Sequence, residues 1–260
     1  MFSKHSDADL SASLPPAYFS GDLPGPTNFR DLGVYTNAHG RRMRPGRLFR
    51  SDHLGGLSPE AGATLAGLGI TRVLDLRGAT ERVAAVCGLD GVQVHSLAIE
   101  PTVVQVLNAL IDAGRPLTTQ DVVAHMQDTY RGFVRHNSPR FAELFRHLLE
   151  SDAPLVFHCT AGKDRTGFAA ALILQALDVP GEIVWRDYLL TNERLKPPAH
   201  HRLGLTPEVA NVLWRVQPEF LNAAFDEVDT GYGSTDAYLR DALGIGHAER
   251  AQLKALYLQD

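Results

Sequence analysis

The ten residues HCTAGKDRTG, at positions 158–167, bring together side chains that can perform nucleophilic chemistry. They follow the apolar run PLVF and precede the helix-like stretch FAAALILQAL. The thiol of Cys159 stands six positions before the guanidinium of Arg165. We call residues 158–166 the cysteine loop. If this loop curls back on itself, its backbone N–H groups face a common centre and form a nest that binds a tetrahedral anion.

Each residue of the loop then has a candidate role. Cys159 is the candidate nucleophile, because loop amides and the start of the following helix stabilise a thiolate. Arg165 can hold two oxygens of a phosphoryl group side-on, which a lysine cannot do in the same planar way. Gly162 permits the bend, and Thr166 can donate its hydroxyl to the sulfur. The backbone amides of residues 160–164 would form the cradle, and Thr160, Ala161, Gly162 and Lys163 are candidate substrate-binding residues.

These residue types favour displacement at phosphorus. Cys159 attacks, a thiophosphate intermediate forms, and water hydrolyses it. The loop amides and Arg165 supply the positive field that Mg²⁺ supplies elsewhere, so we expect neither a metal nor a cofactor. A buried structural cysteine before an ordinary turn is the competing interpretation. It gives no reason for His, Cys, Lys, Asp and Arg to gather beside apolar walls.

The leaving oxygen needs a proton, so a general acid must lie nearby. Asp164, within the loop, and Asp75, at the end of the strand-like VLDLR, are the two candidates. We favour Asp164. Asp75 fits almost equally well as a strand-end carboxylate that pairs with Arg77 or caps a turn, and Asp164 could instead orient Lys163 or Arg165.

Strands and helices must position these groups. The segments RLFRS (47–51), ITRVLDLR (70–77), VQVHSLAI (92–99) and PLVFH (154–158) are typical of strands. Apolar residues at helical spacing predict a helix over 122–134. A second helix is expected to begin at Ser138–Pro139, and a third is expected over 165–177. Ser58, Thr206 and Ser234 are typical helix caps.

The pattern predicts an α/β protein with its strands mainly in the first 160 residues and a helical C-terminal third. Residues 1–27 read as a loosely ordered N-terminal arm, and residues 28–260 as a single domain. The apolar stretch 103–113 is expected to be helical.

The composition fits an ordinary globular chain of 260 residues, 44% hydrophobic and 21% charged. Its net charge of −5 argues against nucleic acid as a partner. The two cysteines, Cys87 and Cys159, are too few for a disulfide framework. We find neither a signal peptide nor an apolar run long enough to span a membrane, so we expect a cytoplasmic protein or one exported without a cleaved signal.

The cysteine loop matches the HCxxGxxR[ST] signature of the cysteine-dependent protein-tyrosine phosphatase superfamily, and the chain resembles its atypical bacterial branch, the protein-tyrosine phosphatase B type. The supporting stretches follow the family's order: TNFRDLG (27–33), LFRSDHL (48–54), VLDLRGATER (73–82), DYLLTNE (187–193) and YGSTDAYLRDALGI (232–245). The resemblance implies a protein-tyrosine-phosphatase-like fold with a central, mostly parallel sheet flanked by helices. It also implies a helical lid in the C-terminal third, for which residues 202–216 are the expected segment.

The resemblance implies activity on phosphotyrosine and, as in several members, on phosphoserine, phosphothreonine and phosphoinositides. The expected partner is therefore a phosphoprotein or a phosphoinositide substrate. The chain lacks the tryptophan-proline-aspartate loop of eukaryotic tyrosine phosphatases. Asp164 resembles the acid of myotubularin lipid phosphatases, and Asp75 is placed at the pocket edge. Lys163 resembles the loop lysine of phosphatases that accept inositol phosphates.

Other functions remain to be distinguished from a phosphatase. A phosphoinositide-directed lipid phosphatase uses the same chemistry on a more anionic substrate. A rhodanese-like sulfurtransferase also carries a cysteine in an anion-binding loop, but the Arg165–Thr166 pair favours phosphate. An inactive phosphate-binding module would keep the cradle without turnover.

Overall fold

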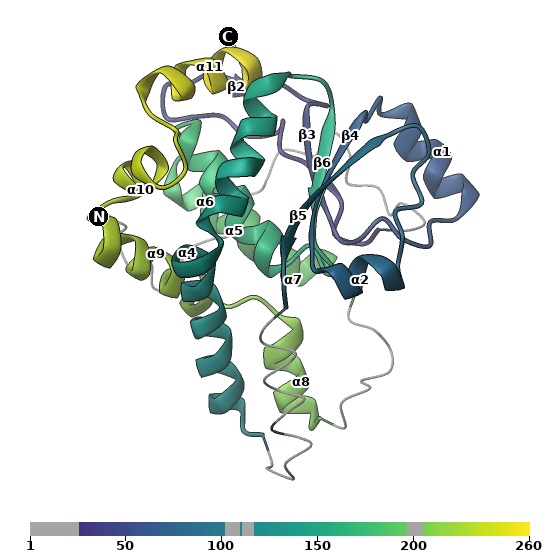
Figure 1. Ribbon diagram of the computed structural model, residues 1–260, viewed down its shortest axis with the longest axis vertical. Helices are drawn as coiled ribbons and strands as arrows, with labels where there is room; N and C mark the ends of the chain where they lie inside the picture. Colours follow the sequence, from purple (N-terminus) through teal and green to yellow (C-terminus); the bar gives the residue numbers. More distant parts are fainter. Residues whose placement is uncertain (1–25, 102–109, 111–116, 197–204) are drawn as a thin grey trace.

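A five-stranded sheet lies at the centre of the computed structural model, which describes residues 26–101, 110, 117–196 and 205–260. Its strands are β1 (Arg30–Asp31), β3 (Leu48–Ser51), β4 (Arg72–Arg77), β5 (Gln93–Ile99) and β6 (Leu155–His158). The order across the sheet is β1-β3-β6-β4-β5, in which β1 is antiparallel to β3 and the other pairs are parallel (Figure 1). The four predicted strands and the mostly parallel sheet are confirmed.

Both faces of the sheet are covered, because its strands carry apolar side chains toward each face. On β4, Leu74 and Leu76 belong to the larger hydrophobic core, whereas Val73 belongs to a smaller one. The larger core contains residues of α4 (Thr119–Glu150), α5 (Asp164–Ala176) and α9 (Pro218–Tyr232). The smaller core is closed by Leu65 of α1 (Pro59–Gly67).

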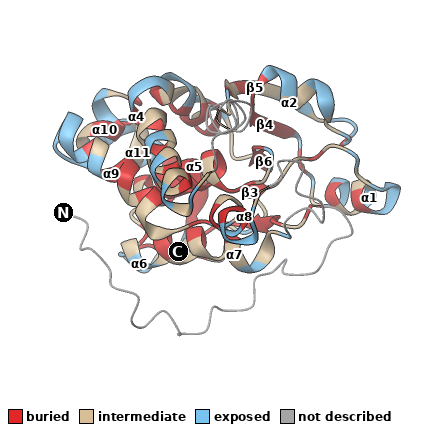
Figure 2. Ribbon diagram, turned by 90° about the horizontal axis from the view of Figure 1, so that it is seen from below, coloured by how far each residue is buried: buried red, intermediate tan, exposed pale blue. Residues whose placement is uncertain are grey.

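The remaining elements surround this sheet (Figures 1 and 2). They are α2 (Ala79–Ala84), α6 (Gly181–Leu189), α7 (Thr191–Arg194), α8 (Pro207–Trp214), α10 (Thr235–Asp241), α11 (His247–Tyr257) and the two-residue strands β2 (Arg42–Met43) and β7 (Leu258–Gln259). The helical C-terminal third is confirmed. The antiparallel β2–β7 pair was not predicted, because two residues per strand are too few for an alternating pattern.

The predicted helix starts are confirmed by their caps. The hydroxyl of Ser58 accepts a hydrogen bond from the Ala61 amide at 3.1 Å, and Pro59 occupies the first helical position. Thr206 caps α8 and Ser234 caps α10 in the same way. Each cap thus satisfies a backbone donor that the first turn leaves unpaired.

The prediction of two helices meeting at Ser138–Pro139 is wrong, because α4 continues through Pro139. A proline inside a helix costs about 3 kcal/mol or more. Here the residues on both sides of it, such as Val134 and Phe141, lie on one buried face in the same core. The Ser138 hydroxyl also bonds to the Val134 carbonyl at 2.6 Å. Packing along the whole face therefore outweighs the local preference of proline.

Several expectations fall wholly or largely outside the described residues: the arm at 1–27, apart from its last two residues, and the helix at 103–113. The single domain over 28–260 stays a prediction. Among the described residues, no helix combines the length and the apolar composition that crossing a membrane requires.

Candidate active site

The cysteine loop connects β6, in the middle of the sheet, to α5. It lies at the carboxyl ends of the parallel strands, where ligands bind in open α/β sheets. Cys159 directly follows β6 and is only 2% exposed. The strand before it and the helix after it are both buried in the core, so the loop between them is held at its two ends.

The carbonyl groups of the loop are bound on its outer side. The Asn28 amide donates to the carbonyl oxygens of Ala161 at 3.2 Å and Gly162 at 2.9 Å, and Arg50 donates to Gly162 at 2.9 Å. The backbone amide of His53 donates to the Thr160 carbonyl at 3.0 Å. The N–H and C=O of one trans peptide point in opposite directions, so these contacts turn the amides of the next residues toward the inside of the loop.

Gly162 is required where the loop bends. Its φ of +63° lies in the left-handed region that favours glycine. A Cβ on this residue would also collide with the backbone of Ser51 and Asp52 at the end of β3. The predicted role of Gly162 in the bend is therefore supported by both its conformation and its surroundings.

A buried ionic cluster stands behind the loop. The Asp187 carboxylate accepts from Arg30 at 2.9 Å, from Arg50 at 2.5 Å and from the Tyr35 hydroxyl at 2.9 Å. Burial alone would raise the pKa of Asp187, but the two guanidinium groups hold it well below its usual value. Two cations face one anion, so the cluster places net positive charge beside the anion-binding loop.

Arg165 is held in place by Glu81 of α2, a residue for which no role was predicted from the sequence. Its Nη1 donates to Glu81 Oε2 at 2.7 Å and its Nη2 to Oε1 at 2.9 Å. Burial alone would raise the pKa of Glu81, but the hydrogen bonds and charge of Arg165 lower it to about 2. Burial alone would lower the pKa of Arg165, but the charges of Cys159 and Glu81 raise it. The pair is therefore ionised at neutral pH.

These contacts fix which edge of the Arg165 guanidinium is available. Both hydrogens of Nη1 are used, because this nitrogen also donates to the Ile99 carbonyl at 2.9 Å. Nη2 reaches the Thr160 hydroxyl only at 3.5 Å. The hydrogen bonds of Arg165 within the described part of the chain involve Nη1 and Nη2 and leave Nε unused. The Nε–Nη2 edge can therefore hold two phosphoryl oxygens side by side.

Asp164 is the first residue of α5 and lines the same pocket as Cys159 and Arg165. Its Oδ1 accepts a hydrogen bond from the Tyr130 hydroxyl at 3.0 Å, and its Oδ2 lies 3.4 Å from Lys163 Nζ. The Tyr130 hydroxyl also lies 2.8 Å from that of Tyr188. These contacts fix the orientation of the carboxylate at the pocket wall.

Asp75 lies elsewhere. It is 1% exposed and does not line this pocket. Arg77 donates to it from Nη2 at 2.7 Å and from Nε at 2.9 Å. Burial alone would raise the pKa of Asp75, but these hydrogen bonds and the neighbouring His158 lower it. The geometry is that of the strand-end ion pair anticipated from the sequence.

Two other loop residues have unexpected surroundings. Lys163 is 3% exposed, and its ammonium donates to the carbonyl of Leu213 at 2.5 Å, in the last turn of α8. The Thr166 hydroxyl is buried and has no hydrogen-bond partner among the described residues. The structure therefore does not show the expected bond from Thr166 to the Cys159 sulfur.

The pocket at the loop has a volume of about 290 Å³. The charged part of its wall includes Asp164, Arg165 and Lys163, and its apolar part includes Met126, Phe133, Leu213 and Trp214. Leu213 and Trp214 come from α8, within the segment expected to form a lid. Two larger cavities do not contain Cys159.

The structure thus brings Cys159, Thr160, Ala161, Lys163, Asp164 and Arg165 to one pocket wall. It adds Glu81, Asn28 and Arg50, whose roles depend on contacts across 84, 134 and 112 positions of the chain. For two of these residues, Glu81 and Arg50, the sequence contains a weak indication of a structural role. Gly78 precedes Glu81 by three residues at a helix start, and Arg50 interrupts an apolar strand.

This fold and loop define a cysteine-dependent phosphatase, and comparisons with known proteins agree. The model of the tyrosine phosphatase family matches residues 21–259. A candidate tyrosine-protein phosphatase of Cupriavidus necator is 36% identical over 241 residues, which cover 89% of this chain and 86% of that protein. The triple specificity protein phosphatase PtpB of Mycobacterium tuberculosis is 33% identical over 281 residues, covering 91% of this chain and 98% of that protein.

The chain therefore belongs to the tyrosine phosphatase family, and its predicted resemblance to the protein-tyrosine phosphatase B type is confirmed. Among solved structures, that of TpbA from P. aeruginosa is 16% identical, with a TM-score of 0.35, and covers 71% of this chain and 89% of that chain.

Proposed function

We propose that this tyrosine phosphatase hydrolyses phosphotyrosine in proteins through a covalent phosphocysteine at Cys159. One observation carries the proposal: Cys159, Asp164 and Arg165 line one pocket whose other wall is formed by Met126 and aromatic side chains. The charged side suits a phosphoryl group, and the apolar side suits an aromatic ring.

The reaction runs in two steps. The Cys159 thiolate attacks phosphorus, the bond from phosphorus to the tyrosine oxygen breaks, and Asp164 gives its proton to the leaving oxygen. Water then attacks the phosphocysteine, Asp164 takes a proton from it, and the bond from phosphorus to sulfur breaks to release phosphate. The loop amides and the free edge of Arg165 stabilise the charge of the phosphoryl oxygens in both steps.

Lys163 and the apolar wall bear on the breadth of substrates. The Lys163 ammonium is bound to α8 carbonyls, so it is not presented as a free second cation for an inositol phosphate. The apolar wall favours aryl phosphates over phosphoinositides. We include phosphoserine and phosphothreonine as substrates, a breadth that the words 'triple specificity' in the name of the M. tuberculosis relative support. We expect them to react more slowly, because they have no ring to lie against the apolar wall. Phosphopeptides and phosphoinositides assayed side by side decide this breadth.

The general acid is tested by the leaving group. Asp164→Asn should reduce kcat on phenyl phosphate or a phosphotyrosine peptide by about 100-fold, and on p-nitrophenyl phosphate by much less, because only the poorer leaving group needs the proton. Asp75→Asn is the matched comparison, and its effect should not depend on the leaving group. An equal loss on both substrates with Asp164→Asn would contradict its role.

The nucleophile is tested separately. Cys159→Ser should abolish turnover of p-nitrophenyl phosphate in metal-free buffer while phosphotyrosine binding persists. A wild-type protein that binds phosphate without any turnover would instead be the inactive binding module. Transfer of sulfur from thiosulfate to cyanide would indicate a sulfurtransferase.

A further inference from the structure

The helix that carries Glu81 has no hydrophobic anchor. None of the six residues of α2 is buried (Figure 2), and Val83 is 81% exposed. Burial of apolar side chains, which holds most helices of a globular protein, therefore cannot fix its position. Yet Glu81 must be placed accurately to make two hydrogen bonds to Arg165. Polar contacts at the ends of α2 must supply that accuracy.

Arg77 provides such a contact at the carboxyl end of α2. Its Nη1 donates to the carbonyl of Ala85 at 2.7 Å and approaches that of Glu81 at 3.5 Å. A cation is favourable here, because the last carbonyls of a helix lack intrahelical partners and carry partial negative charge. Arg77 is 1% exposed, so the contact is shielded from water.

The other edge of the same guanidinium is fixed to the sheet. Nε and Nη2 both bind the Asp75 carboxylate, which also accepts from the backbone amide of Arg77 at 3.0 Å. Asp75 lies opposite His158 in the pairing of β4 with β6, and His158 directly precedes Cys159. Arg77 is thus held at a fixed position relative to β6, the strand that leads directly to Cys159.

We propose that Arg77, anchored by Asp75, is a positioning residue of the phosphate clamp: it fixes α2 so that Glu81 holds Arg165 in its phosphate-binding orientation. The inference rests on the proposed role of Arg165. It assigns Asp75 to this brace rather than to proton transfer. The contacts run from Asp75 through Arg77 and the end of α2 to Glu81.

A double-mutant cycle tests the brace, with binding of inorganic phosphate, measured by calorimetry, as its main readout. Arg77→Met should weaken phosphate binding by about tenfold in the wild-type background. In the Glu81→Gln background it should have less than about a twofold effect, because the contact through which it acts is already lost. Arg77→Lys, which keeps the charge but cannot bridge both partners, should fall between wild type and Arg77→Met.

Arg72 offers a matched control on the same strand. It is also buried and also donates to helix-end carbonyls, those of His147 at 2.7 Å and Ser151 at 2.9 Å, but these belong to the end of α4. Arg72→Met should lower the unfolding midpoint without changing phosphate affinity. This control separates loss of the brace from general destabilisation.

Two other results of this cycle would overturn the inference. Equal losses for Arg77→Met in both backgrounds would show that Arg77 acts independently of Glu81. Unchanged phosphate affinity would show that α2 is fixed by other contacts.

If Arg77→Met does not fold, Asp75→Asn enters the same cycle with the same expected result. A selective loss on poor leaving groups with Asp75→Asn would make Asp75 the acid instead. Phosphate binding without turnover in the wild type would refute the proposed function alone.

Discussion

Glu81 and Arg165 form an ion pair with an arrangement that local sequence could not reveal. Six positions separate Cys159 from Arg165, so their proximity follows from one loop, and that part of the site was predicted. Glu81 lies 84 positions before Arg165 and meets it only because β4 and β6 are neighbours in the sheet. The same holds for Asn28, which reaches the loop carbonyls from before β1.

Glu81→Gln tests this pair in catalysis. The amide keeps the shape of the side chain but removes its charge, so it can no longer form two charge-assisted hydrogen bonds. We expect kcat/KM on p-nitrophenyl phosphate to fall about 10- to 100-fold, and equally on poorer leaving groups, because Arg165 contacts the phosphoryl group in every case. Unchanged kcat/KM would show that Arg165 keeps its orientation without Glu81.

The stability difference between wild type and Glu81→Gln should depend on pH. The pKa of Glu81 is lowered from its ordinary value of 4.5 to about 2 in the folded protein. Its contribution to stability is therefore fully present above pH 4.5 and is lost as the pH falls toward 2. Wild type should unfold at a higher temperature than Glu81→Gln at pH 6, and the difference should shrink progressively below pH 4.5. A difference that stays constant down to pH 2 would contradict the assigned pKa.

At the scale of elements, α8 is joined to the cysteine loop through Lys163. The ammonium lies at the carboxyl end of α8, where it satisfies the Leu213 carbonyl and interacts favourably with the helix dipole. The side chain of Asn192 makes two hydrogen bonds of 2.8 Å to the backbone of Val216, two residues beyond the end of α8. The end of α8 is therefore tied both to the loop and to α7.

Lys163→Met should loosen α8 selectively. Removal of this charge-assisted hydrogen bond leaves the partly buried Leu213 carbonyl without the Lys163 donor. We expect the amide hydrogens of residues 208–214 to exchange about tenfold faster, because local opening of α8 becomes easier. Amides of α9 in the same molecule serve as the control and should not change. Equal exchange in α8 with and without the lysine would show that packing alone holds this helix.

The wrong prediction of two helices meeting at Ser138–Pro139 shows a limit of local rules. Proline disrupts helices through its missing amide and its ring, and these properties are visible in the sequence. The compensating gain at Pro139 comes from Val134, Phe141 and their partners on other helices, and those contacts exist only in the folded chain. The caps at Ser58, Thr206 and Ser234 were predictable because they involve residues three positions apart.

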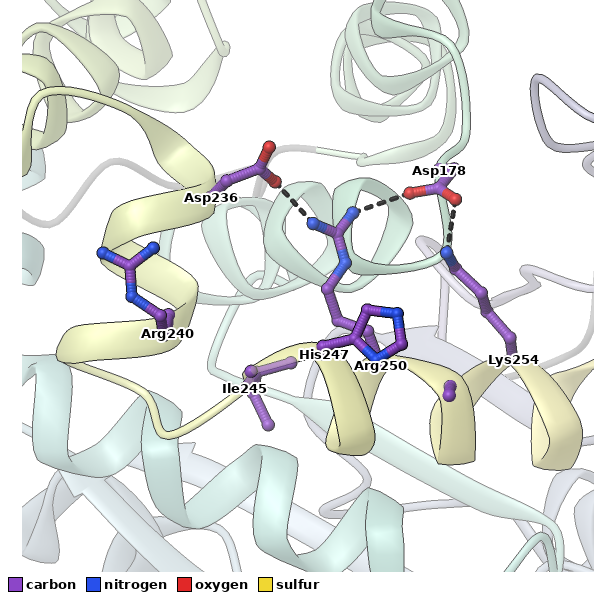
Figure 3. Close-up of a pocket in the computed structure, with 9 residues that line it drawn as sticks. Asp178, Asp236, Arg240, Ile245, His247, Arg250 and Lys254 are labelled. Atoms are coloured by element: carbon purple, nitrogen blue, oxygen red, sulfur yellow. Dashed lines mark hydrogen bonds and ion pairs between the residues drawn. The ribbon is translucent and has the colours of Figure 1, made fainter.

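At the scale of the whole molecule, the C-terminal helix is tied to the end of the helix that follows the cysteine loop. Arg250 of α11 lies between Asp178 and Asp236, and Lys254 also reaches Asp178 (Figure 3). Arg250 donates further to the carbonyls of Gln175 and Ala176, in the last turn of α5. The two cations and the two acids border a cavity of about 500 Å³, so Arg250 and Lys254 are already paired with acids there.

Arg250→Met should destabilise the fold without altering the site. It removes several charge-assisted bonds and leaves two α5 carbonyls without their side-chain donor, so we expect a loss of about 1–3 kcal/mol in the free energy of unfolding. Urea denaturation at pH 7 measures it. Phosphate affinity of the folded variant should equal that of wild type. A loss of phosphate affinity would show that α5 transmits changes from this end to the loop.

Low pH should remove part of the stability that Arg250 contributes through its pairing with Asp178. Burial alone would raise the pKa of Asp178, but Lys254 and Arg250 lower it below its ordinary value of 3.8. The stabilisation is complete above that value and is lost as the pH falls through the lowered pKa. The difference between wild type and Arg250→Met should therefore diminish below about pH 4.

The contact of Gly162 with the end of β3 has a consequence for how such a chain can diverge. No side chain fits at this position unless Ser51 and Asp52 retreat, and Arg50, the residue before them, binds the Gly162 carbonyl. A substitution at Gly162 would therefore need both a strained backbone conformation at this residue and a different backbone path at the end of β3. Divergence at Gly162 is thus constrained by Ser51 and Asp52, which lie more than a hundred positions earlier in the chain.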